Sequence, residues 1–425
     1  MRPFSSPLIR LGLVAIALYL AGCARVSQPD NAAVSPSPSP SAMSQSTPSD
    51  GVDSQFVEAQ NRFALKLFSQ IDAQSDGDNI FISPTSIAIA LAMTYNGADG
   101  DTQAAMARTL ELQGLSLDAV NQANAALDRT LENTGEGVKL AIANSLWLRQ
   151  GVNFNSKFLQ QIQKSYRARV ESLDFNDPNA PAIINGWVAQ QTNDKIEQIV
   201  GQISPQTLLY LINAIYFKGD WTYPFPEDAT EDRPFTLPDG REVQHPLMSR
   251  TGEYRYLETE EFQAIRLPYG EGNIGFYVFL PREESSLAQF YDRLDVQAWS
   301  DWIDRMRSRR GSISLPRFEL KYDIELKDTL AALGMEIAFT PDRANFSKMH
   351  APPPSLAISQ VKHKTFVEVN EEGTEAAAAT SVGITATSAQ EPQEPFNMTI
   401  DRPFFCTIRD DRTGAILFIG SIINP

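Results

Sequence analysis

The side-chain types that carry out most protein chemistry are scarce in this sequence. Its 425 residues include three histidines, His245, His350 and His363, and two cysteines, Cys23 and Cys406. Two thiols can form neither a disulfide framework nor a four-cysteine zinc site. The motifs HExxH, CxxC, GxSxG and GxxxxGK[ST] do not occur in the sequence. We therefore expect no metal site, no cofactor and no catalytic residue.

Two patterns imitate active-site motifs. Gly270, Gly272 and Gly275 have the GxGxxG spacing of a dinucleotide-binding turn. That turn must open a helix whose N-terminus faces a pyrophosphate, but residues 276–280 read FYVFL and favour a strand, so a β-turn is the better interpretation. His363 and the many serines suggest a hydrolase. Because no sharp strand-to-helix turn presents a serine, we interpret His363 as a buried structural histidine.

The most unusual segment lies near the C-terminus. Residues 365–401 contain no Lys or Arg, and residues 371–388 read EEGTEAAAATSVGITATS. Alanine favours a helix, whereas small side chains also favour a mobile loop that proteases can reach. In addition, every second residue from Thr374 to Ile384 is uncharged, and this face ends in β-branched residues, as in a half-buried strand. We predict a loop that can exist in two states.

Helices are expected early in the chain and strands later. Apolar residues at helical spacing predict helices, which are 56–71, 86–98, 117–133 and 323–333, the last ending at Gly334. Continuous apolar runs at 140–148 and 208–217 are typical of strands buried on both faces. Shorter strands are expected at 79–84, 313–320, 404–409 and 415–422. Without regular βα alternation, repeats or a composition break after residue 54, we predict one large α+β domain.

The net charge excludes one class of partner. The chain has 36 Lys and Arg against 52 Asp and Glu, a net charge of −16. Residues 1–50 carry three Arg against two Asp, so the remaining residues carry −17. Such a surface repels phosphate backbones, and we expect no nucleic-acid partner. The hydrophobic fraction of 42% is ordinary for a globular protein with a large core.

The N-terminus has the pattern of an export signal followed by a tether. An uncharged run at 11–22 follows two arginines and is too short to span a membrane, as in a secretory signal. Its end, Leu20-Ala21-Gly22-Cys23, is similar to the lipobox of bacterial lipoproteins, which implies removal of residues 1–22 and acylation of Cys23. An ordinary signal peptide with an incidental cysteine is the alternative. Residues 23–54 are rich in Ser and Pro and are expected to be a disordered tether. The expected location is the cell envelope, with a membrane-anchored lipoprotein whose folded domain is periplasmic or extracellular.

Motifs throughout residues 55–425 resemble the serpin family. They are NIFISP at 79–84 with Ser86, NGA at 96–98, NAIYFKG at 213–219 with Trp221, VEVNEEGTEAA at 367–377, RPFF at 402–405, and FIG at 418–420 with NP at 424–425. So many ordered motifs in one chain are highly specific. The resemblance implies an α+β fold with three β-sheets, eight or nine helices and an exposed reactive-centre loop at about 371–395.

The resemblance also implies a suicide inhibitor of endopeptidases. In this family a protease attacks the loop and forms an acyl-enzyme, and the freed loop inserts into the large sheet and distorts the protease. Inhibitory members need small residues in the hinge, and the hinge residues here are Glu371, Gly373, Thr374, Glu375, Ala376, Ala377, Ala378 and Ala379. The alternative is a non-inhibitory serpin-fold surface protein, either a protease substrate or a binding protein. A solute-binding lipoprotein has less support.

The family's spacing places the reactive bond at Thr387–Ser388, with Ala386 and Ala389 as the neighbouring positions. Because the segment has no Lys or Arg, trypsin-like targets are disfavoured, since their pocket requires a cation. Small neutral residues favour elastase-like or subtilisin-like serine proteases, with papain-like cysteine proteases as an alternative. We expect a covalent complex with the protease and otherwise a monomer.

The resemblance assigns roles to several buried polar residues. It implies that opening of the sheet is controlled by a hydrogen-bonded cluster of four residues, Ser83, Ser86, Asn213 and His363. It also implies that Trp221 packs where the loop first enters the sheet. Ordinary buried packing is the alternative. Cys406 lies in an apolar strand and is expected to be an inert core thiol. Glycosaminoglycan activation is not expected, because helix 117–133 carries three acidic residues against one arginine.

Overall fold

The computed structural model describes residues 51–205, 207–351, 355–374 and 394–425. All of them belong to one compact unit, Thr47–Pro425. The proposed lipidation site Cys23 and the loop residues 375–393, which include the hinge alanines and the Thr387–Ser388 bond, lie outside the described residues. What the sequence predicts for them stays a prediction.

The early helices confirm the predicted periodicity. They are α1 (Ser54–Asp72), α2 (Pro84–Tyr95) and α4 (Leu117–Glu132). Each begins after a residue whose side chain accepts a hydrogen bond from a backbone N–H of the first turn: Asp53, Ser83 and Ser116. The other α-helices are α3 (Gly100–Thr109), α5 (Ser156–Tyr166), α6 (Ala180–Gln191), α7 (Leu287–Tyr291), α8 (Val296–Arg305), α9 (Lys327–Leu330) and α10 (Glu336–Phe339). No helix within the described ranges combines the length and apolar character that a membrane crossing requires.

The helix predicted at 323–333 begins later than expected. Residues 323–325 belong to strand β10 (Phe318–Glu325), because they pair with residues 362–364 of strand β11 (Val361–Val369). Helix α9 begins only at Lys327, and a π-turn with Gly334 at φ 108° follows it. Strand partners distant in sequence therefore override the local helical periodicity.

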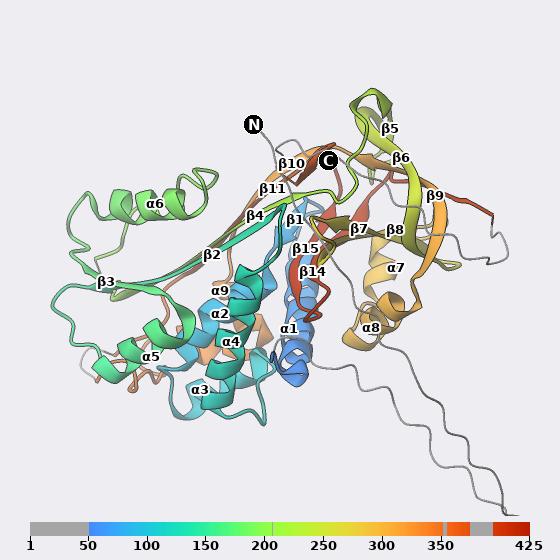
Figure 1. Ribbon diagram of the computed structural model, residues 1–425. Coiled ribbons are helices and arrows are strands. Elements are labelled where there is room, and N and C mark those ends of the chain that lie inside the picture. The colour runs from blue at the N-terminus through green and yellow to red at the C-terminus, as the bar shows by residue number, and fades with distance from the viewer. Residues whose placement is uncertain (1–50, 206, 352–354, 375–393) are drawn as a thin grey trace, which may run out of the picture. The chain divides into compact units, whose positions relative to one another are not determined.

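A six-stranded sheet has the order β10-β11-β12-β4-β2-β3. Its remaining strands are β2 (Val138–Arg149), β3 (Arg169–Leu173), β4 (Leu209–Asp220) and β12 (Gly373–Thr374). The predicted apolar runs form β2 and β4, which pair antiparallel in the middle of this sheet. Helix α6 lies on one side of the sheet and helices α2, α4 and α5 lie on the other (Figure 1). Nearly all of β4 is buried as a result.

The other strands form a nine-stranded network of order β1-β15-β14-β8-β7-β6-β9-β13, with β5 also paired to β6. Its strands are β1 (Ile80–Ile82), β5 (Thr230–Thr236), β6 (Glu242–Glu258), β7 (Phe262–Tyr269), β8 (Ile274–Pro281), β9 (Arg307–Pro316), β13 (Phe396–Thr399), β14 (Phe404–Asp410) and β15 (Ile416–Ile422). The long strand β6 pairs with β5 and β9 along most of its length and with β7 only at its end. It therefore links the part of the network that contains β5, β9 and β13 to the part that contains β7, β8, β14, β15 and β1.

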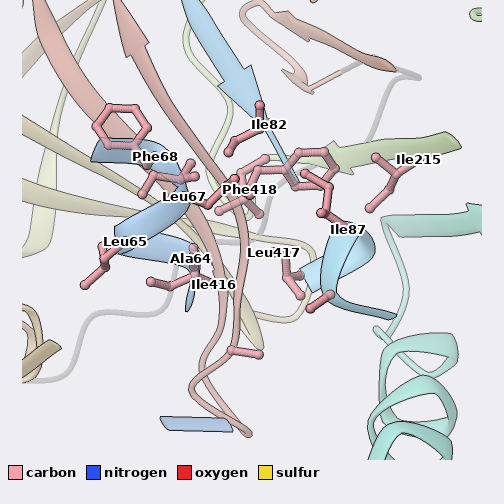
Figure 2. Close-up of a cluster of buried hydrophobic side chains, with 14 of the residues drawn as sticks. Ala64, Leu65, Leu67, Phe68, Ile82, Ile87, Ile215, Ile416, Leu417 and Phe418 are labelled. Atoms are coloured by element: carbon pink, nitrogen blue, oxygen red, sulfur yellow. The ribbon is translucent and has the colours of Figure 1, made fainter. Parts of the chain in front are cut away.

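The main hydrophobic core lies where helices α1 and α2 meet strands of both networks. Figure 2 shows Phe68 of α1, Ile87 of α2, Ile215 of β4 and Phe418 of β15 in this cluster. A smaller, separate core lies under α6 on the opposite face of the six-stranded sheet and includes Trp147. Burial of each large apolar side chain contributes about 1.5–3 kcal/mol. The six-stranded sheet is thus held from both faces.

Candidate functional site

The candidate site is the junction between strands β4 and β11. Residues 361–366 of β11 and 211–216 of β4 run parallel and pair directly. Beyond these pairs the two strands are separated by β12, in which Thr374 lies opposite both Gly219 of β4 and Val369 of β11. The first residues of the predicted hinge therefore already occupy one end of a strand position in this sheet.

A tight turn carries the chain from β11 back into β12. The Asn370 N–H donates to the Gly373 carbonyl oxygen at 2.9 Å. The Asn370 side-chain oxygen accepts from the backbone N–H groups of Glu372, at 3.1 Å, and Gly373, at 3.2 Å. Asparagine favours such turns because its side chain can bond to its own backbone two residues on. The reversal makes the hinge antiparallel to β11.

The segment 221–225 binds the outside of this turn. The backbone N–H of Trp221 donates to the Glu372 carbonyl and that of Phe225 to the Glu371 carbonyl, each at 2.8 Å. The Trp221 indole Nε1 also donates to the Asn370 carbonyl at 2.9 Å. Trp221 thus holds the turn that precedes β12 through two hydrogen bonds.

The carboxylate of Glu371 is almost completely buried beside the turn. It accepts a hydrogen bond from the Thr230 hydroxyl at 2.8 Å, and the Arg317 guanidinium lies 3.7 Å away. A buried carboxylate is costly unless it is paired and hydrogen-bonded, and both conditions are met here. The first hinge glutamate therefore anchors the loop to its base.

Thr374 lies on the inner face of the sheet and is fully buried. Its hydroxyl is 2.6 Å from the hydroxyl of Tyr269, whose ring stacks on Trp221 at 4.3 Å between centroids. Burial raises the pKa of Tyr269 well above its usual value, so the phenol stays neutral. Thr374, the last described residue of the hinge, therefore has a hydrogen-bond partner in the buried interior.

Gly373 meets a strict steric limit. A Cβ atom at this position would lie 2.1 Å from the carbonyl oxygen of Gly219 on β4. No side chain fits at that distance without moving the backbone of one strand. The hinge as a whole is predicted to need small residues. At Gly373 the reason is that the backbones of the hinge and β4 come too close for a side chain.

The structure brings Ser83, Ser86, Asn213 and His363 together beneath β4 and β11. The Asn213 side-chain nitrogen donates to the Ser86 hydroxyl, to the Ser86 carbonyl at 3.1 Å and to the Asn144 side chain at 2.9 Å. His363 Nδ1 is 3.0 Å from Asn213 Oδ1, across the junction of the two strands. This cluster ties together the strands that an incoming strand would have to part.

His363 is fully buried, as predicted. Its Nε2 accepts from the Ser83 backbone N–H at 3.0 Å, so its Nδ1 carries the proton and donates to Asn213. Burial lowers the pKa of His363 to about 3. Because Nε2 is bound to a backbone N–H and not to a serine hydroxyl, the residue is not set up as a general base.

The far end of the loop is attached separately. The Arg309 guanidinium of β9 donates to the Glu394 carbonyl from Nε at 3.1 Å and from Nη2 at 2.9 Å. Arg309 also pairs with Glu258 at 3.0 Å and lies over the Tyr256 ring. Phe396 at the start of β13 stacks on the same ring at 3.9 Å. These contacts form the C-terminal base of the loop.

Other candidates are structural. Gly270 and Gly272 lie in the turn between β7 and β8, which confirms a β-hairpin rather than a nucleotide site. Cys406 is buried in β14, and burial raises the pKa of its thiol, which keeps it in the unreactive form. In the part of the chain that the structure describes, no three His, Cys, Asp or Glu side chains are grouped to hold a metal ion.

The sequence did not point to Asn144, Tyr269 or Arg309. Asn144 could have been found, because it interrupts the apolar run 140–148 and lies opposite Asn213 in the β2–β4 pair. Tyr269 and Arg309 carry no such signal. Their roles follow from pairing between segments more than 80 residues apart.

Comparison with known proteins agrees with this geometry. A family model described as serpin, serine protease inhibitor, matches residues 58–425. Human leukocyte elastase inhibitor is 35% identical over 383 residues, which cover 87% of this chain and all of that protein.

Two solved structures are also similar. The native-state crystal structure of the thermophilic serpin tengpin superposes with a TM-score of 0.80 at 34% identity, and covers 89% of this chain and 96% of tengpin. Thyroxine-binding globulin in complex with thyroxine superposes with a TM-score of 0.79 at 26% identity, and covers 87% of this chain and 99% of that one.

Proposed function

This chain belongs to the serpin family, whose members are mostly protease inhibitors rather than enzymes, and we propose that it traps endopeptidases covalently by inserting its cleaved loop into the six-stranded sheet. The observation that carries the proposal is the position of β12. Gly373 and Thr374 lie between β11 and β4 and pair with both. The insertion would continue a strand that has already begun.

The register of β12 predicts where each further loop residue would lie. Thr374 lies opposite Gly219, so in continued antiparallel pairing Ala376 falls opposite Phe217 and Thr380 opposite Asn213. Phe217 belongs to the main core, and Asn213 holds His363. The small loop residues on this face would therefore pack against the hydrophobic core as the strand inserts. Insertion past Thr380 would require the hydrogen bond between Asn213 and His363 to break.

Insertion replaces one interface between strands with two. The six direct pairs between β11 and β4 are lost, and the new strand pairs with both neighbours. The net gain is on the order of ten ladder hydrogen bonds at about 0.5–1.5 kcal/mol each, and burial of Val382 and Ile384 adds about 1.5–3 kcal/mol each. The uncut chain is then metastable by roughly 10 kcal/mol, which is the driving force for trapping.

The chemistry belongs to the protease. Its nucleophile attacks the carbonyl carbon of Thr387, the bond to the Ser388 nitrogen breaks, and that amine leaves with a proton from the protease's general acid. The products are an acyl-enzyme and a C-terminal fragment that is no longer covalently linked but stays bound through β13, β14 and β15. Movement of the inserting strand then pulls the acyl group out of the oxyanion hole, so hydrolysis of the ester stalls.

The proposed targets are elastase-like or subtilisin-like serine proteases. The loop residues around the bond are small and neutral, and residues 365–401 contain no Lys or Arg. The 35% identity with human leukocyte elastase inhibitor supports the same class.

We also propose that acylation of Cys23 anchors the protein in a membrane and that residues 23–54 tether the inhibitor at the cell envelope. The support is the sequence Leu20-Ala21-Gly22-Cys23 and the Ser- and Pro-rich segment after it. The full chain is expected to partition into detergent when it is expressed in a lipoprotein-processing host, and Cys23→Ala is expected to stay in the aqueous phase. Equal partitioning of both would contradict acylation.

A pair of adjacent substitutions tests the insertion. Ala376→Arg would place a charge against Phe217 on the core side of the inserted strand, whereas Glu375→Arg would place it on the opposite face, beside the partly exposed Lys218. With an elastase-like protease, we expect the wild type and Glu375→Arg to give an adduct that survives a denaturing gel. Ala376→Arg is expected to be cleaved without an adduct.

The peptide released from the adduct would identify the bond cut near Thr387. Equal trapping by Ala376→Arg and the wild type would show that strand insertion is not the mechanism. Cleavage of the wild type without an adduct would instead favour a non-inhibitory member of the family.

A further inference from the structure

One exposed aromatic side chain lies beside the base of the loop. Tyr223 is 45% exposed and Ile183 is 41% exposed, and they are the two exposed large hydrophobic residues among those described. Tyr223 is in the segment 221–225, whose two ends bind the hinge through Trp221 and Phe225. Thr222 is fixed in addition by a 2.9 Å bond to the Pro268 carbonyl. The backbone at Tyr223 is therefore held while its ring faces solvent.

Arg250 of β6 lies over the ring of Tyr223. Its guanidinium lies 4.9 Å from the centroid of Tyr223. Along the sheet, Arg250 pairs with Ile313 of β9, and Ile313 pairs with Met398 of β13. Two strand spacings, about 10 Å, thus separate Arg250 from the strand that forms the C-terminal base of the loop. The pair Tyr223 and Arg250 is therefore next in sequence to the residues that hold the N-terminal base and two strands away from β13.

No carboxylate among the described residues neutralises the charge of Arg250. Its Nη1 donates to the Tyr254 hydroxyl at 3.3 Å, and the other contacts of the guanidinium are the faces of two tyrosine rings. Among the described residues, no carboxylate lies within ion-pair distance of it. An unpaired cation beside an exposed tyrosine is unusual on a chain of net charge −16.

We propose that Tyr223 and Arg250 form a docking surface for the target protease, in addition to the loop that the protease cleaves. This inference rests on the proposed function, because a protease that attacks the loop must stand over the surface near the bases of the loop. Tyrosine and arginine are the residue types that most often dominate binding energy at protein interfaces. The surface fits a protease that has a carboxylate next to an apolar recess at the rim of its active-site cleft.

The test measures how fast the loop is attacked, counting adduct and cleaved chain together. The full chain and three variants, Tyr223→Ala, Arg250→Met and Ile183→Ala, are treated with a panel of elastase-like and subtilisin-like serine proteases at several salt concentrations. For the fastest protease, we expect Tyr223→Ala and Arg250→Met each to lower the second-order rate roughly tenfold. Arg250→Met should also reduce the dependence of the rate on salt.

Ile183→Ala is the matched control, because Ile183 is equally exposed but lies on α6, and its rate is expected to match the wild type. The fraction trapped as adduct should be the same in all four proteins, since the docking surface acts before the bond is cut. Rates for Tyr223→Ala and Arg250→Met within twofold of wild type for every protease would overturn the proposal. Cleavage of the wild type without an adduct would contradict the proposed inhibition, but the attack rates of the variants would still test the docking surface. A chain that no protease attacks would contradict both the inhibition and the docking surface.

Discussion

His363 of β11 connects its strand to β4, and these are the two strands that the proposed insertion would separate. Its ring bonds to Asn213 on β4 from one nitrogen and to the backbone of Ser83, at the start of α2, from the other. Both bonds require the neutral ring with its proton on Nδ1. Protonation of Nε2 would remove the acceptor for Ser83 and place an unpaired charge in the core. The closed sheet therefore depends on a histidine that stays neutral.

This dependence predicts a pH effect of known sign. The unfolded chain binds a proton at His363 near pH 6.5, whereas the folded protein does not until about pH 3. Stability contributed by this residue is present above pH 6.5 and is lost as the pH falls below it, by about 1.4 kcal/mol of unfolding free energy per pH unit. Urea unfolding between pH 7.5 and 4.5 should show a shallower loss for His363→Gln than for the wild type.

The matched control is His245→Gln, since His245 is partly exposed on β6. Because His363 is intact in this variant, its unfolding free energy should fall more steeply with decreasing pH than that of His363→Gln. Parallel curves for the wild type and His363→Gln would mean that this histidine is not the group that titrates.

Adding a single methyl group at Gly373 is expected to destabilise the protein. Gly373→Ala would bring a methyl group 2.1 Å from the Gly219 carbonyl oxygen, so the hinge or β4 must shift, at a cost of about 1–3 kcal/mol of unfolding free energy. Gly186→Ala in α6 is the control, because a Cβ there meets no atom within 4 Å and a helical alanine gains about 0.5–1 kcal/mol. Thermal melting should move in opposite directions, and a shift of both variants in the same direction would refute the close approach.

At the scale of elements, the loop is attached at two bases that differ in kind. The N-terminal base is a hinge paired into the six-stranded sheet, with its turn bound by the segment 221–225. The C-terminal base is the short parallel strand β13 beside β9, fixed at its start by Arg309 and by the stacked ring of Phe396. The insertion that we propose would release the first base toward the sheet and would need the second to stay in place.

The C-terminal base should therefore loosen when its arginine is removed. Arg309→Met loses two hydrogen bonds to the Glu394 carbonyl and the ion pair with Glu258. We expect amide hydrogen exchange in β13 to become roughly tenfold faster, which corresponds to the loss of about one net hydrogen bond. The adjacent, exposed Arg310 provides the control variant Arg310→Met, and equal exchange in both variants would show that Arg309 does not hold this base.

At the scale of the whole molecule, the sequence predicted the elements better than their partners. The apolar runs at 140–148 and 208–217 identified β2 and β4. The strand face predicted from the alternation after Thr374 stays a prediction, because those residues lie outside the described ranges. The helix expected from residue 323 was wrong at its start, because pairing of residues 323–325 with β11 overrides local periodicity.

Contacts between distant segments could not be predicted from local sequence patterns. The bond from Tyr269 to Thr374 joins residues 105 positions apart, and nothing in the spacing of either residue indicates it. The cluster of Ser83, Ser86, Asn213 and His363 was predicted through resemblance to the serpins, and the structure brings these residues together. Local physics alone would have identified them only as buried polar groups.

The proposed mechanism requires the intact fold to store free energy that loop insertion releases. The melting temperature of the full chain, measured before and after a single cut in the loop with both fragments still associated, tests this requirement. We expect the cut form to melt about 10 °C or more above the intact form, because roughly 10 kcal/mol is gained when the strand fills the position begun by Gly373 and Thr374. An unchanged or lower melting temperature after the cut would contradict the proposed insertion.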